Sequence, residues 1–371
     1  MTFRETITAT FKKQKTDKVV WQPRIEHWYN VNTVRNAIPE KYINKTLLDI
    51  YDDLNASPRY YYGASTDISE PQTFLKITYK NGAEIRQIPQ KDGISLIYNS
   101  PKGQLTGKKA FGEWGCSWHF SEFPVKKISD FEILEDILQK TVTEFNYDFY
   151  REAEKQLGDR GICQFYFDRS PLQNLFLMYM GIENTIYANF DQPQRIKEFL
   201  KIAGDAQDQL FEVLQKCPVS VLNFGENIDG QFDSPQLFNE YLVPYYQKRL
   251  SQLHKAGKFC HIHMDGALKP LLPYINDAGF DAIEAATPLP QGDVTIEEIK
   301  DAMGDTILMD GIPAIFFLPD YPNEELEKFT KKVIDLFSPN LILGISDEIS
   351  PVGDIEKVRF VSKLVTQTDR F

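Results

Sequence analysis

The chain has few cysteines and few histidines, and it lacks long apolar runs. Its four cysteines, Cys116, Cys163, Cys217 and Cys260, form no C-x-x-C pair, which indicates free thiols and excludes a disulfide framework or a thiolate zinc knuckle. No run of about eighteen apolar residues, the length of a transmembrane helix, occurs. The polar N-terminus lacks the apolar segment of a signal peptide. We therefore expect a cytoplasmic protein that does not act in a membrane.

Basic residues are also in deficit. The net charge of −12, from 53 acidic and 41 basic residues, is spread along the chain and forms no tail. This pattern argues against nucleic acid or an anionic membrane as the main partner, because both attract basic patches. The hydrophobic fraction of 42% in 371 residues is typical of a globular protein with a substantial core. Small molecules or another protein remain as partners.

From residue 161 onward, short apolar runs alternate with helical patterns, as in repeated βα units. The expected strands are 161–167, 219–224, 258–263, 281–285, 306–309 and 341–345. The first barrel strand is expected at 19–28, ahead of a helical stretch at 33–54. No glycine fingerprint for a dinucleotide follows any of these strands, which weighs against the rival open, doubly wound sheet. The sequence predicts an α/β fold, a TIM (β/α)8 barrel.

The pattern changes between about residues 71 and 107. Residues 74–79 alternate in polarity, Asn81-Gly82 is a strong two-residue hairpin signal, and 83–88 and 94–98 are expected to pair beside it. We interpret 71–107 as a β-hairpin-containing insertion that covers one end of the barrel. The amphipathic segment 130–157 then leads back into the barrel. We treat 1–371 as a single barrel domain with this insertion.

The densest group of metal-capable side chains is His261, His263 and Asp265, which occupy alternate positions of one expected strand. Successive strand side chains point to opposite faces, so these three share a face if the strand continues through 265. Only five histidines occur in the chain, and two of them lie here. The plainer alternative is a hydrogen-bonded core histidine beside an aspartate that caps the next helix.

In such barrels the reacting groups come from the C-terminal ends of several strands. Acidic residues stand at or just after four of the expected strands: Glu226, Glu284, Asp310, and Asp347 with Glu348. On the expected first strand, Arg24 and Glu26 share one face and His27 lies on the other. Converging nitrogen and carboxylate ligands suit zinc or another divalent ion acting as a Lewis acid. The alternative for Asp310 is a role in the turn at Gly311, whereas Glu284 in an apolar strand needs a partner if buried.

The chain resembles the uroporphyrinogen decarboxylase superfamily and, within it, the corrinoid-dependent methyltransferase branch. The resemblance begins at Phe3-Arg4-Glu5-Thr6 and runs to the end. Its most specific parts are Ser234-Pro235-Gln236-Leu237-Phe238 through Val243-Pro244-Tyr245, His263-Met264-Asp265-Gly266, and Gly344-Ile345-Ser346-Asp347. The resemblance implies a TIM barrel with the active site inside its C-terminal mouth.

Zinc methyltransferases of this superfamily usually carry His-x-Cys-Gly at the turn and a second cysteine after the last barrel strand. Here His263 matches the histidine, and Asp265 and Asp347 stand where the cysteines would be. Glu284 resembles an additional acid of the family site. With His261 as the alternative histidine, these five residues are the expected metal ligands. Oxygen ligands favour polarising an ether or phenolic oxygen over stabilising a bound thiolate.

The resemblance thus implies transfer of a methyl group from a small methoxylated or methylated compound to the cobalt of a separate corrinoid protein. Zinc and that corrinoid are the implied cofactors, with no corrinoid-binding residue identified in this chain. Arg24, His27 and Glu226 are expected to hydrogen-bond the substrate. Aromatic residues are candidates to line the mouth, with core packing as the alternative role for most of them: Trp28, Tyr60, Tyr61, Trp114 and Trp118. Family members are often dimers, and no feature of the sequence decides whether this chain is a homodimer.

Two alternatives stay open. Uroporphyrinogen decarboxylation needs a basic cleft for a polycarboxylate, and only Pro23-Arg24-Ile25 stands where that enzyme has an arginine-rich signature. A non-catalytic barrel that binds a corrinoid or an aromatic ligand is the other alternative. It would have no need of the His261, His263, Asp265 and Asp347 group, so metal content separates it from the enzyme.

Overall fold

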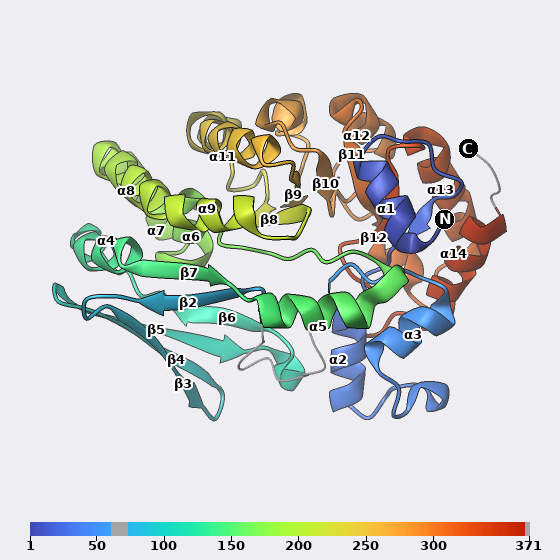
Figure 1. Ribbon diagram of the computed structural model, residues 1–371, viewed down its shortest axis with the longest axis horizontal. Coiled ribbons are helices and arrows are strands. Elements are labelled where there is room, and N and C mark those ends of the chain that lie inside the picture. The colour runs from blue at the N-terminus through green and yellow to red at the C-terminus, as the bar shows by residue number, and fades with distance from the viewer. Residues whose placement is uncertain (61–72, 368–371) are drawn as a thin grey trace.

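The computed structural model describes residues 1–60 and 73–367. Six parallel strands form the central sheet in the order β1-β12-β11-β10-β9-β8. Their bounds are β1 Val20–Trp21, β8 Val221–Ile228, β9 Phe259–Met264, β10 Ala282–Glu284, β11 Ile307–Pro313 and β12 Leu341–Ser346. Helices follow these strands and cover their outer face, among them α11 (Val243–Lys255), α12 (Ile296–Met303), α13 (Asn323–Phe337) and α14 (Ile355–Gln367) (Figure 1). The predicted α/β barrel architecture is confirmed.

Two extended segments complete the barrel wall between β1 and β8. Residues 56–60 lie beside β1, where Ser57 N donates to Trp21 O at 2.9 Å. Residues 161–167 lie beside β8, where Asn223 N donates to Phe165 O at 3.2 Å and Tyr166 forms a parallel bridge with Asn223. No backbone hydrogen bond between these two segments occurs in the described part of the chain. Side chains fill the gap instead, with the Tyr60 and Tyr166 ring centroids 4.5 Å apart.

The barrel interior is apolar at its N-terminal end and polar at its C-terminal end. Helix α1 (Phe3–Phe11) closes the apolar end, because its Ile7 and Phe11 join a buried cluster with Val20, Val221 and Ile307. A capping box, in which Thr2 and Glu5 bond each other's backbone amides, starts this helix. The N-terminal end of the barrel is therefore closed by packing, and the polar C-terminal end forms its mouth.

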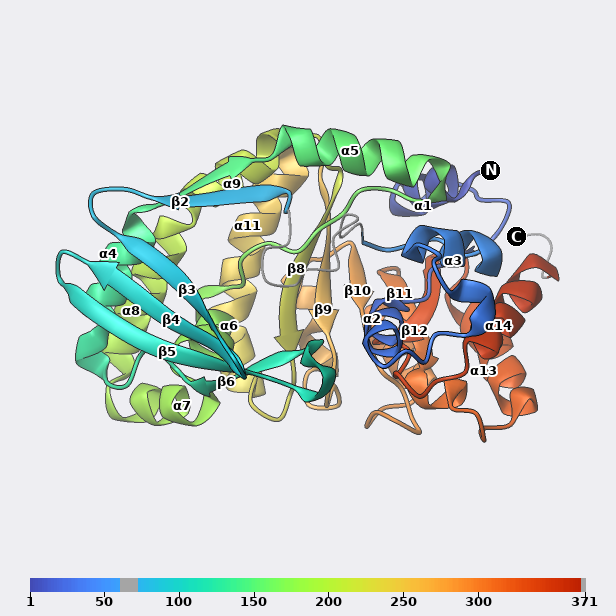
Figure 2. The same cartoon turned by 90° about the horizontal axis from the view of Figure 1, so that it is seen from below.

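Antiparallel strands build a second layer at the side of the barrel nearest β8, as Figure 2 shows. One sheet pairs β2 (Leu75–Tyr79) with β7 (Thr141–Phe145). The other contains β3 (Glu84–Gln90), β4 (Gly93–Ser100), β5 (Gly103–Phe111) and β6 (Trp118–Glu122). Helix α4 (Phe131–Gln139) packs against β4 on one side and α8 (Pro193–Ala206) on the other.

The predicted insertion differs from the structure in its pairing and its length. Asn81-Gly82 does form a tight turn, with φ of 52° and 77° and a bond from Ala83 N to Lys80 O at 3.1 Å. However, β2 pairs with β7 and not with β3, whereas β3 and β4 pair as predicted. The segment 130–157 is α4, β7 and then α5 (Tyr147–Leu157), because the β-branched run at Thr141 favours a strand. Antiparallel strands thus continue to Phe145.

The predicted first strand at 19–28 is wrong beyond Trp21. Pro23 cannot donate to a sheet ladder, and α2 (Glu26–Val34) begins shortly after it. Glu26 and His27 therefore lie in the first turn of a helix and not on alternate faces of a strand. The stretch at 33–54 is likewise broken, since only α3 (Leu47–Leu54) and a short turn of helix at Glu40–Tyr42 follow α2. Of the described helices, none combines the length and the apolar character needed to cross a membrane.

Candidate active site

Glu284 of β10 is the centre of a buried polar cluster inside the barrel mouth. Its Oε2 accepts hydrogen bonds from Tyr60 Oη at 2.7 Å and from Asn223 Nδ2 at 2.8 Å. Its Oε1 lies 3.3 Å from Arg24 Nη1 and 3.4 Å from Arg59 Nη1. Burial alone would raise the pKa of this carboxyl, but Arg59 and the two histidines of β9 hold the pKa well below its usual range. Glu284 is therefore a buried anion with partners on every side.

His261 and His263 both face Glu284, because β9 lies beside β10 with His263 in register with Glu284. His263 Nδ1 is 3.3 Å from Glu284 Oε1, and its Nε2 is 3.9 Å from both Asp265 Oδ2 and Asp347 Oδ1. Burial would lower the pKa of His263, but these carboxylates raise it to about 10. His261 Nδ1 is 2.9 Å from Glu284 Oε2 without the alignment of a hydrogen bond, and burial lowers the pKa of His261.

Arg24 connects the end of β1 with the end of β12. Its guanidinium contacts Asp347 Oδ1 through Nη1 and Glu348 Oε1 through Nη2, the latter at 2.9 Å. The Arg24 side chain is 8% exposed and that of Asp347 is 41% exposed, so the pair spans the boundary between the buried cluster and the open mouth. Arg24 Nε is buried and has no hydrogen-bond partner among the described residues.

A second ion pair lies beside Glu284. Arg59 is fully buried and bonds Asp310 with both terminal nitrogens, at 2.8 and 2.6 Å, and Gln22 Oε1 through Nε at 3.1 Å. Asp310 also accepts from Ala285 N at 3.0 Å. Asp310 is therefore part of an internal charge network and not only a turn residue.

The sequence interpretation missed Arg59 and Asn223, and it included Tyr60 only among the aromatic residues that could line the mouth. The signal for Asn223 was present, because an amide inside the apolar run Val221-Leu222-Asn223-Phe224 needs a buried partner just as Glu284 does. Arg59 and Tyr60 follow a helix in an irregular segment that the sequence analysis assigned to no element.

The structure brings together Arg24 and the five expected metal ligands, His261, His263, Asp265, Glu284 and Asp347, but not Glu226 or His27. Glu226 is fully buried in β8 and accepts from Ser170 N at 2.9 Å and from Ser170 Oγ at 2.7 Å. Burial raises the pKa of Glu226 to about 7. His27 is half-buried on α2, and no hydrogen bond or ion pair joins it to the cluster in the described ranges.

The aromatic residues expected at the mouth differ in their surroundings. Trp28 is buried in the core, whereas Trp114, on the connection from β5 to β6, and Trp118, the first residue of β6, are nearly half exposed. Trp114 lies over the guanidinium of Arg35, just after α2, so this connection reaches toward the mouth. Tyr61 lies outside the described residues.

Potential metal ligands gather at two places in the barrel. At the mouth, ligand atoms of His263, Glu284 and Asp347 lie within 4.8 Å of one another. One imidazole and two carboxylates are donors that zinc accepts, so this set fits the ion that the family resemblance implies. Arg24 shares both carboxylates, and a bound ion would compete with its guanidinium.

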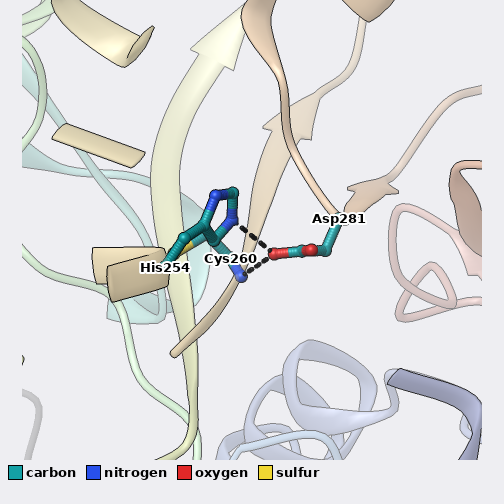
Figure 3. Close-up of side chains that lie close together, drawn as sticks. All are labelled: His254, Cys260 and Asp281. Carbon is teal, nitrogen blue, oxygen red and sulfur yellow. Dashed lines mark hydrogen bonds and ion pairs between the residues drawn. The ribbon is translucent and has the colours of Figure 1, made fainter. Parts of the chain in front are cut away.

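The other group, His254, Cys260 and Asp281, lies at the opposite end of β9. Figure 3 shows that Asp281 Oδ2 accepts from both the ring of His254 and the backbone amide of Cys260, at 2.9 and 2.7 Å. Burial holds the pKa of the Cys260 thiol well above its usual value, so the thiolate that a metal needs is disfavoured. The contacts of Asp281 fasten α11 to the start of β9.

Comparisons with known proteins agree with the fold. The family model described as uroporphyrinogen decarboxylase (URO-D) matches residues 119–368. A methyltransferase from Methanosarcina mazei has a similar structure, with a TM-score of 0.62 and 14% identity, over 99% of both chains. No curated protein sequence matches the chain.

Two other solved structures are similar over much of the chain. A B12-independent methionine synthase from a Shewanella species matches with a TM-score of 0.43 and 10% identity, over 91% of this chain and 85% of its own. A putative vitamin-B12-independent methionine synthase from Listeria monocytogenes matches with a TM-score of 0.42 and 12% identity, over 96% and 98% of the two chains. Because the family model spans well over half of the sequence, the chain belongs to the uroporphyrinogen decarboxylase family.

Proposed function

We propose that this protein is a methyltransferase-like enzyme that moves a methyl group from a small methoxylated or methylated compound to a separate corrinoid protein. The observation that carries the proposal is the mouth cluster, in which Glu284 is a buried anion among two arginines and two histidines. Membership of an enzyme family and the full-length fold similarity to a methyltransferase support it.

The buried contacts of Glu284 orient its carboxylate for this role. Tyr60 and Asn223 occupy Oε2, which leaves Oε1 facing His263 and Arg24 at the open side of the cluster. We propose His263, Glu284 and Asp347 as the ligands of a zinc ion, with Asp265 beside His263 and His261 behind Glu284. Zinc, when bound there, would supply Lewis acidity toward a substrate oxygen.

Arg24 contributes to the same chemistry without the ion. A methylated oxygen gains negative charge as it loses its methyl group, and a fixed donor in a water-poor site stabilises that charge. Arg24 Nε is buried and has no partner within the described residues, and the same guanidinium contacts the carboxylates of Glu284 and Asp347 through Nη1. We assign it to the substrate oxygen. The corrinoid protein, as the methyl acceptor, would approach the mouth from solvent.

Uroporphyrinogen decarboxylation is less well supported by the same residues. A polycarboxylate substrate needs cations that are free to bind it, but Arg24 already contacts Glu284, Asp347 and Glu348. Arg59 is fully buried against Asp310. The net charge of −12 is also unfavourable for a substrate with several carboxylates.

The start of the β insertion packs into the barrel core, although its strands β4 and β5 also build a core of their own, and we propose that residues 1–371 form a single domain. Phe74, at the start of β2, packs against Phe149 of α5 and Phe165 of the barrel wall, each with ring centroids 4.9 Å away. All three belong to the same buried cluster as the barrel strands.

Methyl transfer can be tested directly with cob(I)alamin and a panel of methoxylated and methylated compounds. Loss of the cobalt(I) absorbance reports the transfer, for zinc-reconstituted wild type, Asp347→Ala and the control Asp281→Asn. We expect transfer by the wild type and the control, and a rate lower by about a hundredfold or more in Asp347→Ala. Equal rates in wild type and Asp347→Ala would contradict the site. Carbon dioxide release from a porphyrinogen would support the decarboxylase. The absence of both reactions would support the non-catalytic binding barrel.

A further inference from the structure

A large cavity lies between the β insertion and the barrel wall. Its volume is about 590 Å³, within the range of small-molecule sites. Its walls are mostly apolar and come from β2, β7, α8, α6 (Pro171–Asn174) and the barrel segment 161–169. Leu75, Ile77, Phe74, Phe165 and Leu210 are among its lining side chains. This cavity is separate in its lining from the carboxylates of the mouth.

The cavity reaches the mouth cluster through two tyrosines. Tyr60 and Tyr166 line its barrel end, with their ring centroids 4.5 Å apart. Their hydroxyl groups donate to Glu284, at 2.7 Å from Tyr60 and 3.5 Å from Tyr166. The rings stand in the gap where segments 56–60 and 161–167 share no backbone hydrogen bond in the described chain. A ligand in the cavity would therefore lie one side chain away from Glu284.

Gln164 supplies an unused polar group to this cavity. Its side chain is 1% exposed and lines the cavity, and neither its Nε2 nor its Oε1 has a hydrogen-bond partner among the described residues. A buried amide without a partner is unfavourable, so such a group is expected to bond a ligand or a water molecule. The amide offers both a donor and an acceptor, which matches a hydroxyl group.

The two charged groups of the cavity differ in how fully they are bonded. Asp168 accepts from Asn174 at 2.9 Å and from Gln207 at 2.7 Å. Arg169 donates through Nη2 to Asn227 at 3.0 Å, whereas its buried Nε has no hydrogen-bond partner among the described residues. One acid beside one base is balanced in charge, and together with the apolar walls this favours an uncharged ligand over a carboxylate or an amine.

We propose that this cavity binds the ring portion of the substrate, an uncharged aromatic or alicyclic compound with a hydroxyl group on Gln164. The methylated oxygen of that compound would point past Tyr60 and Tyr166 toward Glu284. The inference rests on the proposed function for the reaction, whereas the binding of the ring does not depend on it.

Fluorescence titration with methoxynaphthalene tests the binding without turnover. Ala206→Trp places a large ring into the cavity from α8, and Met178→Trp does so from another wall if the first variant fails to fold. Ile202→Trp on the same helix is the matched control, because Ile202 lines a different depression. We expect Ala206→Trp to weaken binding by about tenfold or more, about 1.4 kcal/mol, while Ile202→Trp binds as the wild type does.

The hydrogen bond proposed between Gln164 and the ligand hydroxyl is tested by comparing two ligands, one with the hydroxyl and one without it. Gln164→Leu should weaken binding of a hydroxylated methoxynaphthalene about fivefold or more and leave methoxynaphthalene itself nearly unchanged. A carboxylated analogue should bind more weakly than either to the wild type. Wild-type affinity in both blocking variants, or tighter binding of the carboxylate, would overturn the inference. Cavity-dependent binding without any methyl transfer would overturn only the proposed function, and transfer that is insensitive to the blocking variants would overturn only the inference.

Discussion

The two groups of potential metal ligands at opposite ends of the barrel look alike in composition and differ in their charge. His254, Cys260 and Asp281 lie at the start of β9, whereas His263, Glu284 and Asp347 lie at the mouth. At the start of β9, the Asp281 carboxylate accepts hydrogen bonds from the ring of His254 and the backbone amide of Cys260. Each of these bonds ties one chain segment to another.

The mouth has the opposite character. Glu284 is fully buried among cations, and nearby Arg24 Nε and His261 Nε2 have no hydrogen-bond partner in the described residues. A fold gains little from buried charges, since apolar residues of similar size often stabilise it as well or better. Proximity of ligand-type atoms alone therefore does not identify a functional site, whereas buried charge beside donors without partners does.

Removing the central charge should produce the largest effect on stability. Glu284→Gln leaves Arg24, Arg59 and His263 facing a neutral amide, which should lower the free energy of unfolding by about 3–5 kcal/mol. Urea unfolding of the variant beside the wild type measures this loss. A variant as stable as the wild type would show that Arg24, Arg59 and His263 do not need the charge of Glu284. The difference in buried charge between the two ends of the barrel would then have no energetic meaning.

A smaller effect should appear in the pH dependence of Glu226, another buried acid on the mouth side. Burial raises its pKa from 4.5 to about 7, so the folded state holds the proton more tightly than the unfolded state. This contribution is fully present below the unfolded pKa and is lost as pH rises through the folded one. Glu226→Gln cannot ionise, so its stability relative to the wild type should increase between pH 5 and pH 8 by up to about 3 kcal/mol. Parallel pH profiles in urea unfolding would contradict the shift.

Removing the carboxylate of Asp281, at the other end of β9, should lower the free energy of unfolding only slightly. Asp281→Ala leaves the backbone amide of Cys260 without its acceptor and should cost about 1–2 kcal/mol in unfolding free energy. Methyl transfer by the folded variant should stay within about twofold of the wild type, because Asp281 has no contact with the mouth cluster in the described structure. A large loss of activity in well-folded protein would move the functional site to this end.

The smallest expected effect is the slow reaction of the Cys260 thiol with a disulfide reagent in the folded protein. Its burial raises the thiol pKa, and only the thiolate attacks a disulfide reagent. In the native protein we expect Cys116, which is half-buried, to react first, while Cys163, Cys217 and Cys260 wait for unfolding. Mass spectrometry of the labelled peptides assigns each thiol. Rapid labelling of Cys260 in folded protein would show that its surroundings are open, as a metal-binding thiol needs.

The barrel strands were predictable because each is an apolar run that ends in polar residues. The five strands from β8 to β12 and the segment at 161–167 lie within a few residues of their predicted positions. The first strand was misjudged because alternating Arg24 and Glu26 imitate strand spacing, although Pro23 prevents the ladder from continuing. The pairing of β2 with β7 joins residues far apart in sequence, and no local pattern encodes such a choice.

The candidate site also has a part that the sequence predicts and a part that only the structure shows. Acids at strand ends were visible as a pattern, and the structure gathers His263, Glu284 and Asp347 at one point. Arg59 comes from an irregular segment, so only the closed barrel shows that it reaches Asp310. Glu226 also follows an apolar run, but its side chain turns to Ser170 and away from the cluster. Sequence thus predicts which strands supply the site, while side-chain direction needs the packed structure.

Elemental analysis after reconstitution and removal of free metal shows whether the barrel mouth binds zinc. The proteins are the wild type, His263→Ala and Asp347→Ala from the mouth, and His254→Ala and Cys260→Ala from the other end of β9. We predict about one zinc per chain in the wild type, retention in the last two variants, and loss in the first two. A well-folded wild type without zinc, or zinc lost only with His254 and Cys260, would contradict a metal-activated site at the barrel mouth.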